Sequence, residues 1–340
     1  GISWEIAKKH DIGLDLVLFN ERFSLTVDYF NEKRTGIFMS RGSLPLTVGL
    51  YDGDKPYANV GSVINRGWDG NFSFNQNIGN VSLTIRANAT YSDNEILEKD
   101  EGHKLYPYLY ETGFSVSQSR GLIALGLFKD WDDIRNSPTQ NTWGSVEPGD
   151  IKYKDLNNDG QIDAYDQTYI SRGDVPTTVY GFGFTVGWKD LSVGMMFQGV
   201  AGAERVLNGS SVNPFNGGGG SGNLYSNIGD RWTEENPDQN AFYPRLSYGS
   251  ETTSNINNFQ KSTWWVRNMN FLRLKTLQVS YNLPKPWVNK VHLKNAAVYV
   301  MGTNLFTLSR FKLWDPELNT DNGASYPNTT SYSVGINFTF

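Results

Sequence analysis

The 340 residues of the chain include no cysteine and only three histidines. Without thiols, neither a disulfide framework nor a thiolate metal site can form. His10, His103 and His292 share no spacing with a plausible nucleophile or carboxylate, and a catalytic triad is recognised by geometry rather than by the presence of its members. Neighbouring carboxylates such as Asp132 and Asp133 point apart, so they do not indicate glycoside hydrolysis. We therefore predict that the chain is not an enzyme.

Long hydrophobic runs are absent as well. No stretch reaches the roughly 18 apolar residues that a membrane-spanning helix needs, and the mean hydropathy is −0.47. A transmembrane helix is thereby excluded. A membrane protein is not excluded, because barrel strands carry their apolar residues in alternation and their average hydropathy looks soluble.

An excess of positive charge is also missing. The net charge is −5, with 30 Lys and Arg residues against 35 Asp and Glu residues, which argues against a nucleic-acid-binding surface. Aromatic residues, at 14%, and glycine, at 35 residues, are abundant instead. This composition is typical of β-rich proteins.

The end of the sequence shows its clearest pattern. Tyr332, Val334, Ile336, Phe338 and Phe340 occupy every second position, and small polar residues fill the positions between them. Successive side chains of a strand point to opposite faces, so one face of this strand is apolar and the other polar. About ten residues is also the length with which a tilted strand crosses a bilayer. The pattern predicts a transmembrane β-strand.

The same alternation recurs upstream. It predicts a hairpin with strands at 12–18 and 23–29 around a turn at Asn20 and Glu21, and a long strand at 81–92. Further strands are predicted around Trp68, Phe72 and Phe74, and at 180–188, 191–197, 272–281 and 297–304. With one or two strands between Tyr106 and Phe128, we expect ten or eleven in all, and a helical turn at 131–134.

The connections between these strands alternate in length. Turns of about two to four residues alternate with connections of roughly 30 to 80 residues, whereas soluble domains rarely contain so many long loops. Outer-membrane barrels combine short periplasmic turns with long external loops. Six tryptophans lie near expected strand ends, where they would form an aromatic girdle at the membrane surface. The alternative is that they pack in a hydrophobic core. They are Trp4, Trp68, Trp188, Trp264, Trp265 and Trp287.

Several phrases of the sequence resemble the SusC/RagA family of TonB-dependent outer-membrane transporters from Bacteroidetes-type bacteria. They run in the family's order along the whole chain, and Ser333 to Phe340 resembles the assembly signal that ends bacterial barrel proteins. The matching phrases are Trp4–Glu5, Asp11–Asp15, Thr26–Phe30, Asn59–Gly61, Ile64–Trp68, Gly149–Asp155, Phe271–Lys275, Val279–Pro284, Thr303–Phe306 and Asp315–Glu317.

The resemblance implies an all-β fold, a transmembrane antiparallel β-barrel. Family members have an amino-terminal plug domain and a TonB-contacting segment before a barrel of 22 strands, and residues 1–340 match only about the carboxyl-terminal half of that barrel. The chain also opens within a strand pattern and without a signal peptide. We therefore expect a part of a longer polypeptide, because an open half-barrel would leave strand edges unpaired in lipid.

The resemblance also implies a function. We expect a bacterial outer-membrane nutrient importer that takes up a glycan (oligosaccharide) or peptide together with a SusD-like surface lipoprotein. Energy would come from TonB acting on the missing amino-terminal part. Polar residues such as Asp15, Asp28, Arg86 and Asn88 would line the path through the lumen.

Residues 155–166 contain the one motif with metal chemistry. Their spacing resembles an EF-hand calcium loop, in which oxygen ligands converge from fixed positions and Gly160 permits the sharp turn. The predicted ligands are Asp155, Asn157, Asp159, Gln161 through its carbonyl, Asp163 directly or through water, and Asp166. Position twelve is Asp166 rather than Glu, and this shorter side chain should weaken binding. We predict a structural Ca²⁺ that fixes an external loop.

Two rival interpretations remain open at this point. A secreted calcium-binding β-sandwich that binds polysaccharide would also show alternating strands and the calcium motif, although it would seldom end on phenylalanine. A β-rich glycosidase would need a carboxylate pair in one cleft, and the sequence gives no support for one.

Overall fold

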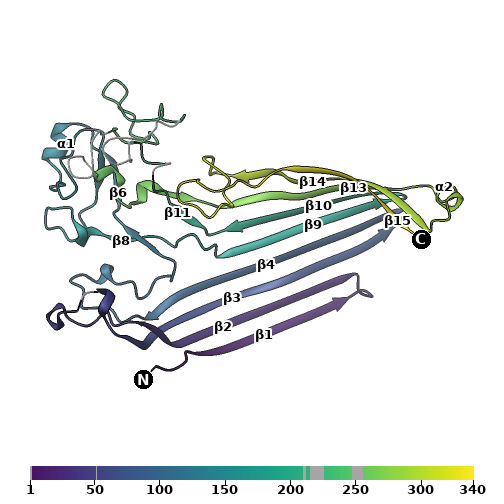
Figure 1. Ribbon diagram of the computed structural model, residues 1–340, viewed down its shortest axis with the longest axis horizontal. Coiled ribbons are helices and arrows are strands. Elements are labelled where there is room, and N and C mark those ends of the chain that lie inside the picture. Colours follow the sequence, from purple (N-terminus) through teal and green to yellow (C-terminus); the bar gives the residue numbers. More distant parts are fainter. Residues whose placement is uncertain (1, 51, 210–211, 215–225, 247–255) are drawn as a thin grey trace.

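The computed structural model describes residues 2–50, 52–209, 212–214, 226–246 and 256–340. Within them, nine long strands form one antiparallel sheet in the order β1-β2-β3-β4-β9-β10-β13-β14-β15 (Figure 1). Their bounds are β1 Ile6–Leu18, β2 Phe23–Ser40, β3 Tyr57–Ile78, β4 Val81–Glu98, β9 Thr178–Trp188, β10 Leu191–Ala201, β13 Phe271–Asn282, β14 Asn295–Ser309 and β15 Ser331–Thr339.

The remaining elements among the described residues are short and lie in the connections. Six strands pair two by two, as β5 with β8, β6 with β7 and β11 with β12. Their bounds are β5 Ser119–Gly121, β6 Ala124–Leu127, β7 Ile151–Tyr153, β8 Thr168–Ser171, β11 Glu204–Val206 and β12 Val266–Asn268. The helices are α1 Trp131–Arg135 and α2 Lys285–Lys290, with single 3-10 turns at Leu46–Val48, Asp52–Asp54, Pro107–Leu109, Ala164–Asp166, Asn257–Phe259 and Thr263–Trp265.

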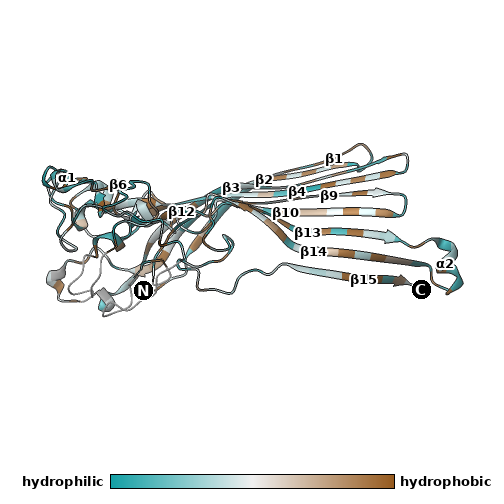
Figure 2. Ribbon diagram, turned by 90° about the horizontal axis from the view of Figure 1, so that it is seen from above, coloured by the Kyte–Doolittle hydropathy of each residue, from teal (hydrophilic) through white to brown (hydrophobic). Residues whose placement is uncertain are grey.

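The register of the sheet aligns the alternation of neighbouring strands. Val334 lies opposite Val300, Val300 opposite Val279, Val279 opposite Val193, and Val193 opposite Val186. Because the side-chain period of a strand is two, this register places the apolar positions of all these strands on one face. Figure 2 shows the resulting alternation of apolar and polar residues along each strand. We call the two sides the apolar face and the polar face.

The sheet has two free edges, β1 and β15. In the described chain β1 pairs with β2 alone and β15 with β14 alone. This architecture agrees with the predicted part of an antiparallel barrel. It does not agree with the β-sandwich alternative, which needs two sheets packed face to face, because all nine long strands lie in one sheet.

The expected strand count needs correction. The sheet contains nine strands rather than ten or eleven. Between Tyr106 and Phe128 the structure has only β5 and β6, which pair with other loop segments and not with the sheet. The expected helical turn is present as α1.

The long connections pack together beyond one end of the sheet and form what we call the loop cap, which comprises the described residues within 99–177, 202–270 and 310–330 (Figure 1). Its core contains side chains from all three connections, including Leu122, Ile162, Leu207, Trp265 and Phe311. The hydrophobic core of the described chain therefore lies mainly in the loops, since both faces of the sheet are open.

Two predicted girdle residues belong to this core. Trp265 is only 2% exposed, and Trp264 packs against the same cluster. By contrast, Trp68, Trp188 and Trp287 are exposed, as a girdle requires. The prediction for Trp264 and Trp265 was wrong because the turn that precedes β12 lies in the loop cap and not at the bilayer edge.

The opposite end of the sheet has short turns, apart from the segment 283–294, which contains α2. In the described part of the chain, no helix combines the length and the apolar character needed to cross a membrane.

Candidate functional site

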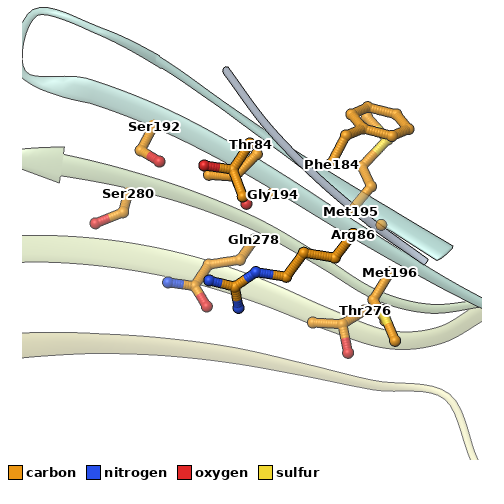
Figure 3. Close-up of a pocket in the computed structure, with 12 residues that line it drawn as sticks. Thr84, Arg86, Phe184, Ser192, Gly194, Met195, Met196, Thr276, Gln278 and Ser280 are labelled. Atoms are coloured by element: carbon orange, nitrogen blue, oxygen red, sulfur yellow. The ribbon is translucent and has the colours of Figure 1, made fainter. Parts of the chain in front are cut away.

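A hollow of about 440 Å³ lies on the polar face, over β4, β9, β10 and β13 (Figure 3). Its lining combines hydroxyls, an amide and a guanidinium with the apolar side chains of Phe184, Met195 and Met196. The polar residues are Thr84, Arg86, Thr185, Ser192, Thr276, Gln278 and Ser280. These residues come from positions that alternate with the apolar ones, so the same period that builds the apolar face builds this hollow.

Glycines limit the side-chain bulk in this hollow and in a second one beside it, Gly183 in the first and Gly181 in the second. A Cβ atom on Gly183 would lie 2.7 Å from the carbonyl oxygen of Met195, and one on Gly181 would lie 2.7 Å from Asn88 Oδ1. Both approaches are closer than a Cβ tolerates. A larger residue at either position would displace the neighbouring strand or side chain and narrow the hollow that it lines.

Arg86 is the cation of this region. Its side chain lines the large hollow and also the second one, of about 350 Å³, beside Asn71, Asn88 and Gly181. Figure 3 shows the guanidinium extended in the direction of Gln278. Among the described residues it has no hydrogen-bond or ion-pair partner, so its donors are available to a ligand.

Negative charge gathers on another part of the polar face. Asp28 lies opposite Asp69 across β2 and β3, and the side chain of Asp15 accepts a hydrogen bond of 2.6 Å from Thr26. By register, Asp11 and Asp15 share this face with Asp28. Of the predicted path residues, the structure therefore places Asp15, Asp28, Arg86 and Asn88 on one face, with the acids on β1–β3 and the cation on β4.

The predicted calcium loop connects β7 with β8 in the loop cap. Asp155 accepts backbone N–H groups of Asn158, at 2.6 Å, and Gly160, at 2.9 Å. Asp159 accepts the N–H of Gln161 at 2.9 Å and the Asn157 amide at 2.8 Å. Gly160 has a φ of +83°, in the left-handed region that a sharp turn needs.

Asp166 closes this loop. One carboxylate oxygen accepts the N–H of Leu156 at 2.7 Å, and the other accepts the N–H of Asp163 at 2.8 Å. Its side chain is fully buried, and this burial raises the pKa of Asp166, with the charges of Asp155 and Asp163 acting in the same direction. Ile162, also fully buried, fixes the loop to the core of the cap.

The donor set of this loop fits a hard divalent cation. Asp155, Asp159, Asp163 and Asp166 have no ion-pair partner among the described residues, so the loop carries uncompensated negative charge and oxygen ligands only. In the described part of the chain, no three such side chains already converge on one ion position. The carboxylates contact backbone N–H groups instead, and the metal assignment stays a prediction.

Tyr108 lies against the calcium loop. Burial raises the pKa of its hydroxyl to about 12, and the charges of Asp166, Asp155 and Asp159 add to the effect. Its ring stacks on Tyr106 at 5.4 Å between centroids, and Tyr106 meets Tyr165 edge to face. The loop is thus packed against the segment that follows β4.

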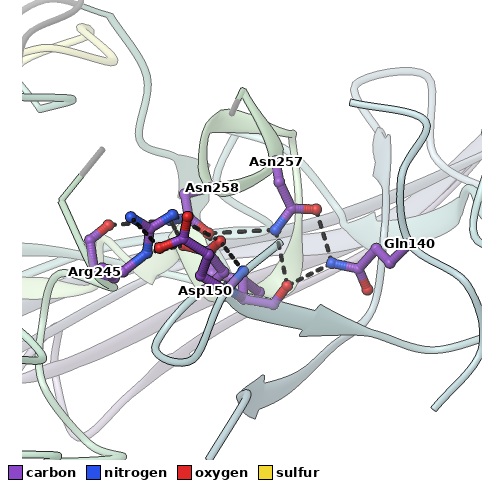
Figure 4. Close-up of polar contacts among 7 residues, drawn as sticks. Gln140, Asp150, Arg245, Asn257 and Asn258 are labelled. Atoms are coloured by element: carbon purple, nitrogen blue, oxygen red, sulfur yellow. Dashed lines mark hydrogen bonds and ion pairs between the residues drawn. The ribbon is translucent and has the colours of Figure 1, made fainter. Parts of the chain in front are cut away.

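A buried polar network joins the segments of the loop cap, and sequence reasoning did not predict it (Figure 4). Both oxygens of the Asp150 carboxylate contact the Arg245 guanidinium at 3.1 Å, and Asn258 donates to Asp150 at 2.8 Å. Gln140 and Asn257 both donate to the carbonyl of Ile151. Burial raises the pKa of Asp150, while Arg245 acts in the opposite direction. The only signal in the sequence was that Asp150 and Ile151 lie in a phrase of the SusC/RagA resemblance.

Three comparisons with known proteins agree with one another. The family model described as TonB dependent receptor-like, beta-barrel, matches residues 1–195. TonB-dependent receptor P26 of Formosa agariphila is 29% identical over 367 residues, covering 100% of this chain and 35% of the relative. TonB-dependent receptor P3 of the same organism is 26% identical over 368 residues, covering 100% of this chain and 34% of the relative.

Solved structures show the same partial coverage. The RagAB peptide transporter is 25% identical with a TM-score of 0.73, covering 99% of this chain and 36% of that chain. The RagAB importer in its open-open state gives a TM-score of 0.74 at 24% identity, which is evidence for the fold alone, and covers 100% of this chain and 35% of that chain. The chain thus spans about a third of the length of the relatives that it matches.

Proposed function

The chain belongs to the TonB-dependent receptor β-barrel family, and from this premise we propose that it forms part of a SusC/RagA-like importer. The family consists of outer-membrane receptors and transporters rather than enzymes. The apolar face then contacts lipid, and the polar face lines the lumen of a barrel that a longer polypeptide completes. In this assignment residues 1–340 are the carboxyl-terminal part of the barrel.

The observation that carries the proposal is the hollowed polar face. A lumen wall needs hydrogen-bonding groups that a hydrated substrate can exchange for water, and Thr84, Arg86 and Gln278 provide them at one place. The substrate is an oligosaccharide or a peptide. RagAB is a peptide transporter, which supports the second class, and the hydroxyl, amide and guanidinium groups of the lining can bind either.

Partners follow from the same assignment. We expect a SusD-like surface lipoprotein over the loop cap, because the long loops of outer-membrane barrels lie on the external side and the cap is built from the long connections at one end of the sheet (Figure 1). TonB would supply energy through the part of the polypeptide that lies outside this chain. Loss of uptake on removal of either partner is the expected phenotype.

Uptake by the host bacterium tests the function. Deletion of the receptor should abolish import of one labelled oligosaccharide or peptide from a panel. The Arg86→Gln variant should lower the import rate by roughly tenfold, since a hydrogen bond to a charged group is worth about 1.5–3 kcal/mol. Arg310→Gln, which changes an exposed arginine outside the hollow, is the matched control. Unchanged import after deletion would refute the importer function.

We propose in addition that residues 155–166 bind a structural Ca²⁺. With free Ca²⁺ at about 100 times Kd, binding should stabilise the loop cap by about 2.7 kcal/mol. Chelation should therefore speed proteolysis of the cap in the wild type. The Asp155→Asn/Asp159→Asn variant should be equally sensitive with and without Ca²⁺, whereas Asp132→Asn/Asp54→Asn should behave as the wild type. A wild-type cap indifferent to chelation would contradict the site.

A further inference from the structure

The segment 283–294 between β13 and β14 differs from the other turns at its end of the sheet. The neighbouring turns at Phe19–Arg22, Gly79–Asn80 and Lys189–Asp190 join their strands directly. Segment 283–294 instead contains α2 and projects beyond the strand ends (Figure 1). A longer connection than the hairpin requires calls for a separate explanation, and no chain segment described here covers it.

Two of its apolar side chains are largely exposed. Trp287 in α2 is 65% exposed, and Val291, the residue that follows α2, is 63% exposed. Val288, in contrast, is only 3% exposed, so a different side of the turn packs against the sheet. Two large exposed apolar residues within one short segment indicate contact with something other than water.

The charges of the segment have one sign. Lys285, Lys290 and Lys294 are exposed, and the segment contains no Asp or Glu. None of the three ammonium groups has an ion-pair partner within the ranges that the structure describes. A cationic segment with exposed apolar residues is the composition of elements that lie in a membrane interface.

The position of the segment agrees with its composition. Short turns of outer-membrane barrels lie at the periplasmic surface, and the backbone of Asn282 donates to the carbonyl of Asp190 at 2.8 Å, which links this segment to the next turn. There Trp188 is 53% exposed, with the Lys189 ammonium 5.1 Å from its ring centroid. Aromatic and cationic side chains thus occur together at the level where the apolar face ends.

We propose that segment 283–294 is a binding surface for anionic phospholipid of the periplasmic leaflet. Trp287 and Val291 lie in the boundary between headgroups and acyl chains, and the three lysines bind headgroup phosphates. Charge complementarity selects anionic over zwitterionic lipid, because a zwitterionic headgroup offers no net charge to the lysines. The surface would hold the barrel at a fixed depth, independently of which substrate it transports.

The test uses the full-length receptor purified in mild detergent and placed in nanodiscs that contain phosphatidylglycerol and phosphatidylcholine in equal amounts. Native mass spectrometry then measures the lipids that stay bound to the released protein. The variant is Lys285→Gln/Lys290→Gln/Lys294→Gln. Its control, Lys104→Gln/Lys129→Gln/Lys312→Gln, removes the same charge from exposed lysines of the loop cap. Heat-dependent gel mobility verifies that every variant is folded.

The wild type and the control should retain phosphatidylglycerol in preference to phosphatidylcholine. In the segment variant the ratio of retained phosphatidylglycerol to phosphatidylcholine should be about tenfold lower. The difference in this ratio between wild type and variant should shrink at high salt, because the lysine charges are solvent-exposed. Trp287→Ser should reduce retention of both lipids. Equal preference in the variant and the control would overturn the proposal. So would a variant with unchanged lipid retention that no longer binds a periplasmic protein, since the surface would then be a protein-docking site.

Discussion

At the scale of single residues, the stability of the loop cap depends on the buried carboxylate of Asp150. The Asp150 carboxylate is fully buried and stays in place through Arg245 and Asn258. A buried ion pair adds little net stability when it is complete, but the loss of one partner leaves an uncompensated charge in a medium of low polarity.

We therefore expect Arg245→Gln to destabilise the loop cap by about 3 kcal/mol. The pair of Arg135 with Asp132 is exposed and worth less than about 1 kcal/mol, so Arg135→Gln is the matched control. Limited proteolysis of the folded receptor, with the cleavage sites mapped, measures both. Equal cleavage rates in the two variants would mean that the Asp150 carboxylate does not need the Arg245 guanidinium to stay in place.

At the scale of elements, the two faces of β15 predict opposite outcomes for one substitution. Val334 lies on the apolar face opposite Val300, and Ser333 lies on the polar face opposite Met301. An arginine on the lipid face of a barrel costs about 2–4 kcal/mol at the bilayer midplane, whereas the lumen face tolerates charge.

Val334→Arg should accordingly reduce the amount of assembled receptor in the outer membrane, and Ser333→Arg should leave it near the wild-type amount. Heat-dependent gel mobility of membrane fractions separates assembled from unassembled protein. If Ser333→Arg were the variant that failed to assemble, the assignment of the two faces would be reversed.

The strands could be predicted because their information is local. The alternation at 81–92 and 331–340 determines the facing of each residue without knowledge of the partner strand, and the structure confirms strands at both places. The loop cap could not be predicted in this way. Trp265 contacts Tyr243 and Phe242. Gln140 contacts Asn257, which lies more than a hundred positions further along the chain. No periodic pattern in the sequence marks such pairs.

In the candidate sites, too, the features with a local sequence pattern could be predicted and those that depend on long-range contacts could not. The polar path residues Asp15, Asp28, Arg86 and Asn88 follow from alternation, and the structure places them on one face. Their grouping into acids on β1–β3 and a cation on β4 depends on strand order, which the sequence pattern does not contain. The calcium loop has a fixed spacing, so it could be recognised, whereas the contact with Tyr108 could not.

At the scale of the whole molecule, the open edges of β1 and β15 indicate an incomplete structure. Unpaired backbone groups are costly in lipid, and the relatives are about three times as long as this chain. We expect the receptor extracted from outer membranes to have roughly three times the mass of 38.2 kDa. Mass spectrometry of the native polypeptide measures it. A membrane-bound polypeptide of 38.2 kDa would require closure by association of several copies instead.

The unequal lengths of the strands also shape the entrance. β2, β3 and β4 have 18, 22 and 18 residues, whereas β9 and β10 have 11 each (Figure 1). At the short turns β3, β4, β9 and β10 end at one level, and β2 begins further in, with Phe23 opposite Phe74. At about 3.3 Å per residue, β3 is roughly 70 Å long, far more than a tilted strand needs to cross an apolar band about 25 Å tall. The two flanks of the entrance therefore differ, with the longest strands on one flank and the loop cap on the other. In the proposed importer, a substrate from the medium would approach the lumen obliquely, and the flank that it meets first would determine its first contacts.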